Sequence, residues 1–235
     1  TSQEVANEMK RLKRRYGLRN HLVGLGVDRI DYTKGIPERF RALDRFFERY
    51  PEFQGRLVFV EIGVPSRVHI DAYQRVNDEI DEVIERVNWK YQREAWKPIL
   101  YVKEHVSPTT LRAWYRLANF CAVTPLHDGM NLVAKEFVAA RTDEQGVLLL
   151  SRFTGAAREL TDALLVNPYA TDQLAHAIHQ AVTMSPEERQ RRMRKLRSVI
   201  HERNIYHWAG NVLSNLFQFE FQGTPTHAAH DPQRL

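Results

Sequence analysis

The chain has 235 residues, of which 43% are hydrophobic and 27% are charged, a balance typical of a globular protein with a sizeable core. No stretch is long and apolar enough for a transmembrane helix, and the single cysteine, Cys121, cannot form an internal disulfide. These features exclude a disulfide scaffold and favour a reducing compartment, the cytoplasm. The formal charge of +5 fits an anionic small ligand as well as a nucleic acid, and alone selects neither.

Residues 1–17 have the pattern of the end of a helix that stops at Gly17. The chain begins with Thr1, and no basic-then-apolar signal segment follows. We therefore expect a fragment in which 1–17 is a helix remnant or linker from a missing N-terminal domain. Residues 18–219 are expected to form the main domain with its C-terminal helices, and 220–235 a tail with little periodicity.

Short apolar runs alternate with amphipathic helical stretches along most of the chain. Apolar runs that predict strands are 21–27, 57–62, 99–102, 120–124, 147–150 and 164–166. Helical spacing of apolar residues predicts helices at 37–50, 68–87, 108–117 and 132–141. This order predicts an α/β, Rossmann-like, doubly wound parallel sheet of about six strands with helices on both faces. Further helices are expected after Thr171, one of them beginning at Ser185 and Pro186.

Basic residues gather at 189–197. One interpretation is contact with nucleic acid or a membrane, and the other is a solvated helix face. We favour the solvated face, because no aromatic side chains are interleaved with the charges and Glu187, Glu188 and Glu202 offset them. The sequence therefore predicts neither a nucleic-acid partner nor a membrane partner.

The loop at 26–35 follows the first predicted strand and runs into a helix. Ligands of open parallel sheets bind at the carboxyl ends of the strands, where this loop lies. Arg29 and Lys34 are close enough on this short connection to converge on one anion, and a guanidinium with an ammonium suits a diphosphate. Asp28 and Asp31 are expected either to brace these cations or to cap the turn.

The loop at 64–67 follows the second predicted strand. Ser66 and Arg67 stand at the start of a long predicted helix, where free backbone N–H groups favour a phosphate. The alternative is that Ser66 caps the helix and Arg67 is solvated, and the residues alone favour this alternative.

The segment 124–136 carries the most specific pattern, a strand end, a glycine turn at Gly129 and a helix that starts near Asn131. The backbone N–H groups of residues 130–132 would face a phosphate, with support from the helix dipole. Asp128 can accept hydrogen bonds from sugar hydroxyls, and Glu136 can accept two from a ribose diol. The alternative, that Asp128 only caps the helix and Glu136 is solvated, is disfavoured because the turn places both acids around one helix N-terminus.

Four strings in the sequence, GVDRIDYTKGIPERF, the SR after the second strand, TPLHDGMNLVAKEFVAA and SRFTGAARELTDALLVNPY, resemble the trehalose-6-phosphate synthase family. These are retaining glycosyltransferases of family 20, built from two Rossmann-like domains (the GT-B type). The resemblance spans roughly residues 18–218 and concerns the C-terminal, donor-binding half. It implies transfer of glucose from UDP-glucose to glucose 6-phosphate, giving trehalose 6-phosphate and UDP. In the family, most of the acceptor site lies in the other half.

The resemblance also implies roles for individual residues. Arg29 and Lys34 would hold the diphosphate and stabilise the leaving UDP, and Asp128 would bind the hydroxyls of the donor glucose. Arg67 would reach the phosphate of the acceptor. The remaining donor-binding residues would be Gly129, Met130, Asn131, Leu132, Val133 and, at the ribose, Glu136. The sequence departs from the common family pattern at His127, where an arginine is frequent, and we expect a small effect on substrate preference.

The residues in these loops also suggest how the reaction runs. No second carboxylate is an obvious nucleophile, which favours a front-face departure in which the leaving phosphate takes the acceptor proton. We expect no cofactor and no metal, because Arg29 and Lys34 supply the charge that a magnesium ion would otherwise supply. The expected partners are UDP-glucose, glucose 6-phosphate and the missing N-terminal domain, and a homo-oligomer stays open.

Three alternatives remain at this point. The first is a related synthase with another acceptor, such as a glucosylglycerol-phosphate synthase, or a pseudo-glycosyltransferase. The second is a regulatory relative with a decayed site, against which the intact Arg29, Lys34, Asp128 and Glu136 argue. The third is a nucleic-acid-binding domain, which only the basic balance suggests. We also expect the isolated chain to bind nucleotide weakly and to turn over nothing, because transfer occurs in the cleft between two domains.

Overall fold

A computed structural model describes residues 1–64, 71–202 and 205–218. Short 3-10 turns lie at Tyr32–Lys34, Pro51–Phe53 and Gly155–Arg158. The strands are β1 (Leu22–Arg29), β2 (Leu57–Val64), β3 (Ile99–Val102), β4 (Phe120–Val123), β5 (Val147–Ser151) and β6 (Leu164–Val166). The helices are α1 (Ser2–Arg15), α2 (Ile36–Arg49), α3 (Asp71–Tyr91), α4 (Pro108–Leu117), α5 (Leu132–Ala140), α6 (Thr171–Thr183), α7 (Pro186–Glu202) and α8 (Ile205–Gln218).

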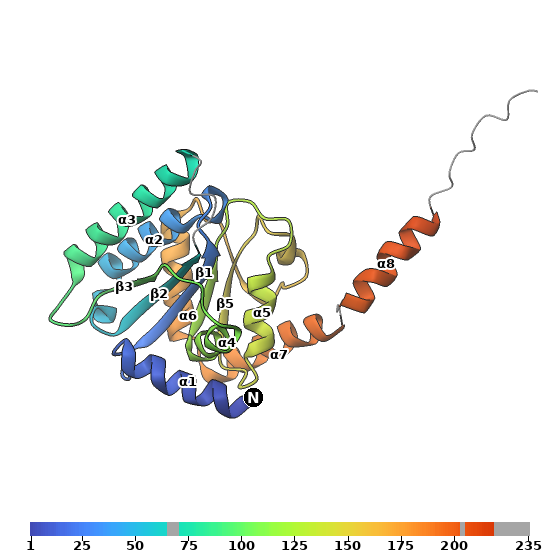
Figure 1. Ribbon diagram of the computed structural model, residues 1–235, viewed down its shortest axis with the longest axis horizontal. Helices are drawn as coiled ribbons and strands as arrows, with labels where there is room; N and C mark the ends of the chain where they lie inside the picture. Colours follow the sequence, from blue (N-terminus) through green and yellow to red (C-terminus); the bar gives the residue numbers. More distant parts are fainter. Residues whose placement is uncertain (65–70, 203–204, 219–235) are drawn as a thin grey trace, which may run out of the picture. The chain divides into compact units, whose positions relative to one another are not determined.

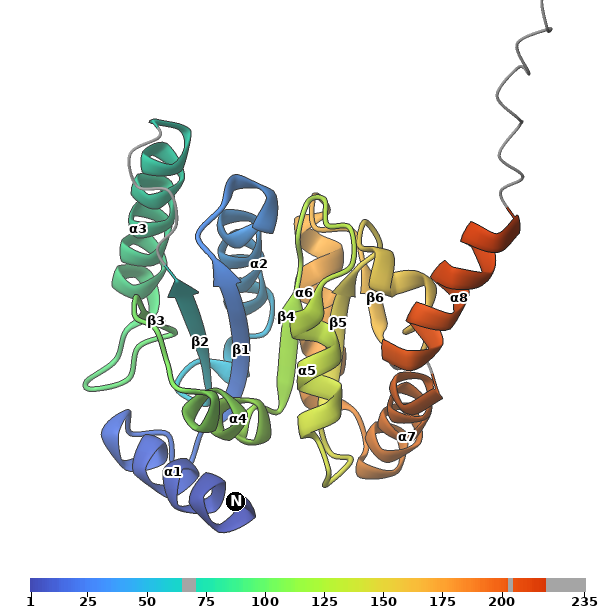
Figure 2. The same cartoon turned by 45° about the vertical axis from the view of Figure 1, so that its right-hand side comes forward.

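The six strands form one sheet in the order β3-β2-β1-β4-β5-β6, and every neighbouring pair is parallel (Figure 2). The chain winds outward from β1 to β3, returns to β4 beside β1, and then winds outward the other way. The strand order therefore reverses between β1 and β4, where doubly wound sheets bind their ligands at the carboxyl edge. This topology confirms the predicted Rossmann-like parallel sheet.

Helices cover both faces of the sheet (Figures 1 and 2). Helix α2 packs between α3 and α6 on one face, and α4 packs between α1 and α5 on the other. Right-handed crossovers account for this division, because the chain moves in opposite directions across the sheet in its two halves.

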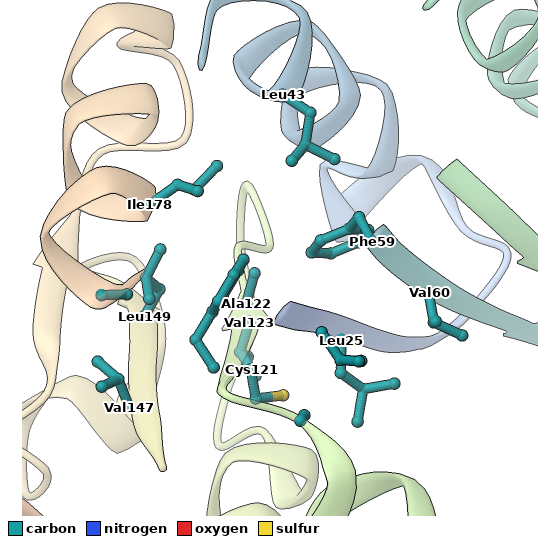
Figure 3. Packing of buried hydrophobic residues seen from close by; sticks show 14 of the residues in the cluster. Leu25, Leu43, Phe59, Val60, Cys121, Ala122, Val123, Val147, Leu149 and Ile178 are labelled. Carbon is teal, nitrogen blue, oxygen red and sulfur yellow. The ribbon is translucent and has the colours of Figure 1, made fainter. Parts of the chain in front are cut away.

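The hydrophobic core lies between the sheet and these helices (Figure 3). Leu43 of α2 and Ile178 of α6 lie over the strand residues Phe59 and Leu149, and all four side chains are fully buried. Strands β4 and β5 are buried along their whole length, as both-face coverage requires. Burial on both faces makes β4 and β5 short apolar runs, and such runs predict strands from the sequence.

The first strand differs from its prediction. Strand β1 continues through Asp28 and Arg29, two residues beyond the predicted end, and pairs there with Gly63 and Val64 of β2. A polar Asp28 is tolerated in a buried strand because its carboxylate accepts a hydrogen bond from Arg39. Arg29 is therefore the last residue of the strand and does not belong to the loop.

The N-terminal helix α1 begins at a capping box in which Thr1 and Glu4 satisfy each other's backbone groups. Its side chains Val5 and Leu12 are buried in the core, and the helix packs on α4. One compact unit covers Thr1–Ile200, so α1 belongs to the same unit as the sheet. A second unit begins at His201 and contains α8.

Several predictions concern the ends of the chain and one helix start. Helix α7 begins at Pro186, with the Ser185 hydroxyl accepting from the Glu188 N–H, as predicted. The predicted tail, 220–235, and the predicted start of the helix at 68 lie outside the described residues. In the part of the chain that the structure describes, no helix has both the length and the apolar character needed to cross a membrane.

Candidate functional site

The connection between β1 and α2 is a tight turn with a polar cap. The Asp31 carboxylate accepts hydrogen bonds from the backbone N–H and the hydroxyl of Thr33, both at 2.9 Å. Asp31 therefore caps the turn, which was one of its two predicted roles. Among the described residues its carboxylate makes no hydrogen bond to Arg29 or Lys34, although its backbone carbonyl accepts from the Lys34 N–H at 3.0 Å. Burial raises the pKa of Asp31, but the Thr33 hydrogen bonds and the Lys34 charge outweigh it and lower the pKa.

The loop after β4 lies directly against this turn. The Leu126 N–H donates to the Thr33 carbonyl at 2.7 Å, and Lys34 Nζ donates to Asp128 Oδ2 at 2.7 Å. Gly35 adopts φ +63°, and a side chain there would collide with the Thr124 carbonyl. The two predicted ligand-binding loops, far apart in the sequence, are therefore in contact at the point where the strand order reverses.

Asp128 is held on both of its carboxylate oxygens. Oδ2 also accepts from the Asn131 side-chain amide at 3.2 Å, and Oδ1 accepts from the Met130 N–H at 3.4 Å. Partial burial raises the pKa of Asp128, but the hydrogen bond and charge of Lys34, with the Asn131 and Met130 donors, outweigh it and hold the pKa below its ordinary value. Asp128 is therefore an ionised acceptor at neutral pH.

Asn131, and not Gly129, takes the left-handed conformation in this loop, with φ 70°. Its side-chain oxygen accepts from the Ala134 N–H at 3.1 Å and so caps α5. Asparagine tolerates this backbone better than most residues, because its short polar side chain bonds locally. One residue thus starts the helix and orients Asp128.

A second loop, between β5 and β6, supports the Asp128 loop from the far side. The Gly155 N–H donates to the Asp128 carbonyl, and the Ala156 N–H donates to the Met130 carbonyl, each at 3.1 Å. Gly155 is required here, because a Cβ at this position would overlap the Gly129 carbonyl. This close backbone approach explains the glycine of the FTGAA string.

The β1–α2 connection and the Asp128 loop line an open cavity of about 430 Å³ at the carboxyl edge of the sheet. Its size suits a small molecule. Exposed Arg29 has no hydrogen bond or ion pair within residues 1–64, 71–202 and 205–218, so its guanidinium is available for a ligand. The cavity is lined by Val27, Asp28, Arg29, Lys34, Asp128, Met130, Asn131, Leu132 and Val133.

Most of the predicted site residues thus come together, and three do not. Glu136 is exposed on α5, does not line the cavity, and accepts a hydrogen bond from the Tyr115 hydroxyl at 2.9 Å. Gly129 lies in the Asp128 loop but does not line the cavity. Arg67, with the predicted loop at 64–67, lies outside the described residues apart from Val64.

A buried ionic network under the cavity was missed by the sequence analysis. Arg39 of α2 donates to Asp28 Oδ2 at 2.8 Å, to Glu61 Oε2 at 2.6 Å and to the Thr124 hydroxyl at 2.9 Å. The sequence did hold a signal, because Arg39 falls on the apolar stripe of its helix and Glu61 interrupts an apolar strand. Charged residues at such positions need buried partners.

The network alters the ionisation of its members. Burial raises the pKa of Asp28 and raises that of Glu61 to about 7, although the Arg39 charge opposes both shifts. Burial alone would lower the pKa of Arg39, but the charges of Glu61 and Asp28 outweigh it and raise the pKa.

Across residues 1–64, 71–202 and 205–218, no group of His, Cys, Asp and Glu side chains has an arrangement that could hold a metal ion.

The fold defines a Rossmann-like domain with a cavity at the switch point of its sheet, lined in part by Arg29 and Lys34. The family model for glycosyltransferase family 20 matches residues 1–218, and the chain belongs to that family. Among curated relatives, a UDP-forming alpha,alpha-trehalose-phosphate synthase A from Dictyostelium discoideum is 38% identical over 213 residues. A trehalose-6-phosphate synthase from Enterobacter is 40% identical over 214 residues.

Solved structures give the same result. A structure described as trehalose-6-phosphate from E. coli bound with UDP-2-fluoro glucose matches with a TM-score of 0.86 and 39% identity, over 94% of this chain and 50% of that one. A UDP-forming synthase from Burkholderia xenovorans in complex with glucose-6-phosphate matches with a TM-score of 0.84 and 38% identity, over 91% of this chain and 49% of that one.

The chain spans less than half the length of the curated relatives named above. The match covers 91% of this chain in both cases, but 29% of the Dictyostelium protein and 43% of the Enterobacter protein.

Proposed function

We propose that this chain is the donor-binding half of a retaining glycosyltransferase that moves glucose from UDP-glucose to glucose 6-phosphate. The products are trehalose 6-phosphate and UDP, so the protein serves trehalose biosynthesis, in the cytoplasm. The observation that carries the proposal is the convergence of Arg29, Lys34 and Asp128 on one cavity at the switch point of the sheet. The names of the relatives and the ligands of the two matching structures support these substrates.

The two cations would bind the diphosphate of the donor. Arg29 presents an uncommitted guanidinium fork, which suits bidentate contact with phosphate oxygens. Lys34 is a compact charge whose present partner is Asp128, only 2.7 Å away. A bound diphosphate gives Lys34 a second anion, and the Asp128 carboxylate then becomes freer to accept hydrogen bonds from the sugar hydroxyls.

The apolar part of the cavity would lie beneath the donor. Met130, Leu132 and Val133 line it beside the start of α5, whose N-terminus favours negative charge. We keep Glu136 as the proposed ribose ligand, and its bond with the Tyr115 hydroxyl would orient the carboxylate for that role.

The proposed reaction proceeds on one face of the sugar. The bond between the sugar C1 and the β-phosphate oxygen breaks, and the acceptor hydroxyl oxygen forms the new bond to C1. The acceptor proton passes to the departing phosphate oxygen, and Arg29 and Lys34 stabilise the negative charge that develops there. No cofactor takes part, and these two cations carry the role for which other transferases use a metal ion.

The acceptor would be held largely outside this chain. The proposed partner is the other half of the enzyme, which would close the cleft over the cavity and bring most of the glucose 6-phosphate site. Arg67 is the proposed contribution of this half to the acceptor phosphate. Turnover by the isolated chain is accordingly not expected.

The test is a calorimetric titration of this chain with UDP in the presence of EDTA. The proposal expects weak binding that Arg29→Ala abolishes. Arg19→Ala is the matched control, because Arg19 is also exposed but precedes the other end of β1. Binding that survives Arg29→Ala, or the absence of binding by the unmodified chain, contradicts the proposed donor site.

A further inference from the structure

Arg39 joins three strands at one point below the cavity. Its guanidinium contacts Asp28 near the end of β1, Glu61 within β2 and Thr124 directly after β4. The side chain is fully buried, as are the Glu61 carboxylate and Thr124. The sequence provides the space for this contact at Gly26, where a Cβ would overlap both the guanidinium and the Glu61 carboxylate.

Two of the residues that Arg39 contacts, Asp28 and Thr124, lie where the two proposed ligand-binding loops begin. Arg39 lies one helical turn after Gly35, whose carbonyl accepts the Arg39 N–H at 3.0 Å. Gly35 packs on the carbonyl of Thr124, the residue from which the Asp128 loop departs. Above this point the loops meet again through Leu126 and Thr33, and through Lys34 and Asp128.

The ionic network stabilises the core poorly for its size, because desolvation of buried charges is unfavourable. Two carboxylates and one guanidinium lose their hydration there, and Glu61 Oε1 has no hydrogen-bond partner among the described residues. Replacement of such buried ion pairs by apolar side chains is often neutral or stabilising in other proteins. The network does, however, fix directions and distances, which apolar packing does less strictly.

We infer that Arg39 is a positioning residue that sets the separation of the Arg29–Lys34 loop from the Asp128 loop across the β1–β4 switch point. This inference rests on the proposed function for its consequence, which is donor binding. Its structural content, the mutual placement of the two loops, can be measured without a ligand.

Thr124→Val gives the sharpest test. The substitution preserves the volume and both ion pairs but removes the hydroxyl that links Arg39 to the β4 side. Tyr91→Phe is the control, because it also removes a buried hydroxyl, one that bonds to Asp44 away from the cavity. We expect Thr124→Val to weaken UDP binding by about tenfold and Tyr91→Phe to leave it within twofold of the unmodified chain.

Amide hydrogen exchange provides the readout that does not depend on the ligand. The Leu126 amide bonds to Thr33 between the two loops, and the Asn119 amide bonds to Val23 at the opposite edge of the sheet. General loss of stability accelerates exchange at both amides, whereas loss of loop placement accelerates exchange at Leu126 alone. We expect Thr124→Val to accelerate amide exchange at Leu126 by about tenfold more than amide exchange at Asn119.

A second pair of variants covers the guanidinium itself. Arg39→Lys keeps the charge but cannot reach three acceptors, and Arg141→Lys is its control at another buried arginine, which donates to Asp143 and to backbone carbonyls. Arg39→Lys should weaken UDP binding and accelerate amide exchange at Leu126 more than at Asn119. Arg141→Lys should leave UDP binding unchanged and should not accelerate exchange at Leu126 more than at Asn119.

The outcomes separate the inference from the proposed function. Equal acceleration of amide exchange at Leu126 and Asn119 in Thr124→Val and Arg39→Lys overturns the positioning role. Where the unmodified chain binds UDP, equal UDP affinity in both variants also overturns it. Selective acceleration of Leu126 in a chain that does not bind UDP at all contradicts the proposed function and supports the positioning role.

Discussion

The carboxyl edge of the sheet and helix α7 both gather basic side chains, but they satisfy them differently. In α7, Arg191 and Arg192 pair with Glu188 of the same helix, and Arg194 pairs with Glu144, all at 2.7 Å. Arg197 donates to the carbonyls of residues 138 and 139. These pairs agree with the solvated-face interpretation of this helix.

At the carboxyl edge the charges come from separate strands and face a cavity. Arg29 ends β1 and keeps its guanidinium available, while Lys34 and Asp128 meet from two different loops. Below them, Arg39 and its carboxylates are removed from water. The number of charges in a segment therefore says little about ligand binding. Charged side chains that converge from several elements and are incompletely paired indicate a ligand site better.

Loss of turnover should distinguish the two basic regions most strongly. Arg29→Ala or Lys34→Ala, in an enzyme completed by the other half, should lower kcat by on the order of 10²-fold or more, because each would stabilise charge in the transition state. Initial rates of UDP release measure the loss. Arg191→Ala in α7 is the control and should retain full activity. Near-normal rates in both cavity variants would remove the distinction between the two basic regions.

The next effect concerns stability and tests the buried network. The pKa of Glu61 rises from its ordinary 4.5 to about 7 in the fold, first because of burial. The folded state therefore holds this proton more tightly, so its stabilising contribution is complete below about pH 4.5 and is lost as the pH rises through 7. Among the described residues, the charged or titratable groups around Glu61 are Asp28 on β1, Arg39 on α2, Tyr101 on β3 and Cys121 on β4.

Glu61→Gln isolates this contribution. Between pH 5 and 8 the free energy of unfolding of the unmodified chain should fall by on the order of 2 kcal/mol relative to the variant. Urea unfolding of both proteins at several pH values measures the difference. Parallel pH curves for the chain and the variant would show that Glu61 keeps an ordinary pKa.

A smaller effect separates sugar from nucleotide. Asp128→Asn keeps the shape of the side chain but removes its charge and one acceptor oxygen. We expect UDP affinity to be maintained, because Lys34 loses a competing anion. The ratio of the affinity for UDP-glucose to the affinity for UDP should fall by about tenfold. Paired titrations with the two ligands measure the ratio. His127→Ala, next to it and exposed, should preserve the ratio.

The sequence predicts the strands of this molecule well and its buried polar contacts poorly. Strands β3 and β6 have the predicted bounds, and the others differ by no more than two residues at either end. Apolar runs are local features, and parallel strands buried on both faces make them strong. The β1 strand was predicted too short because Asp28 looks like a loop residue until its partner Arg39 is known.

The candidate site shows the same division. The cavity-lining roles of Arg29, Lys34 and Asp128 follow from motifs placed at strand ends, together with the resemblance to a family. The contact of Arg39 with Thr124 joins residues 85 positions apart, and no local pattern specifies it. The sequence predicts a glycine turn at Gly129, and the residue with positive φ in this loop is Asn131.

The smallest expected effect concerns the α7 surface, and it is the strictest test of the comparison. Arg194→Ala breaks an ion pair with Glu144 in which the arginine is 62% exposed. Such pairs contribute little, so the melting temperature should change by no more than about 2 °C. At each salt concentration the UDP affinity of Arg194→Ala should stay within twofold of that of the unmodified chain. Both affinities should fall as salt rises, because UDP binds at Arg29 and Lys34 by charge attraction. If Arg194→Ala instead lowered UDP affinity as strongly as Arg29→Ala, paired surface charge would contribute to the donor site, and incomplete pairing would no longer distinguish the two regions.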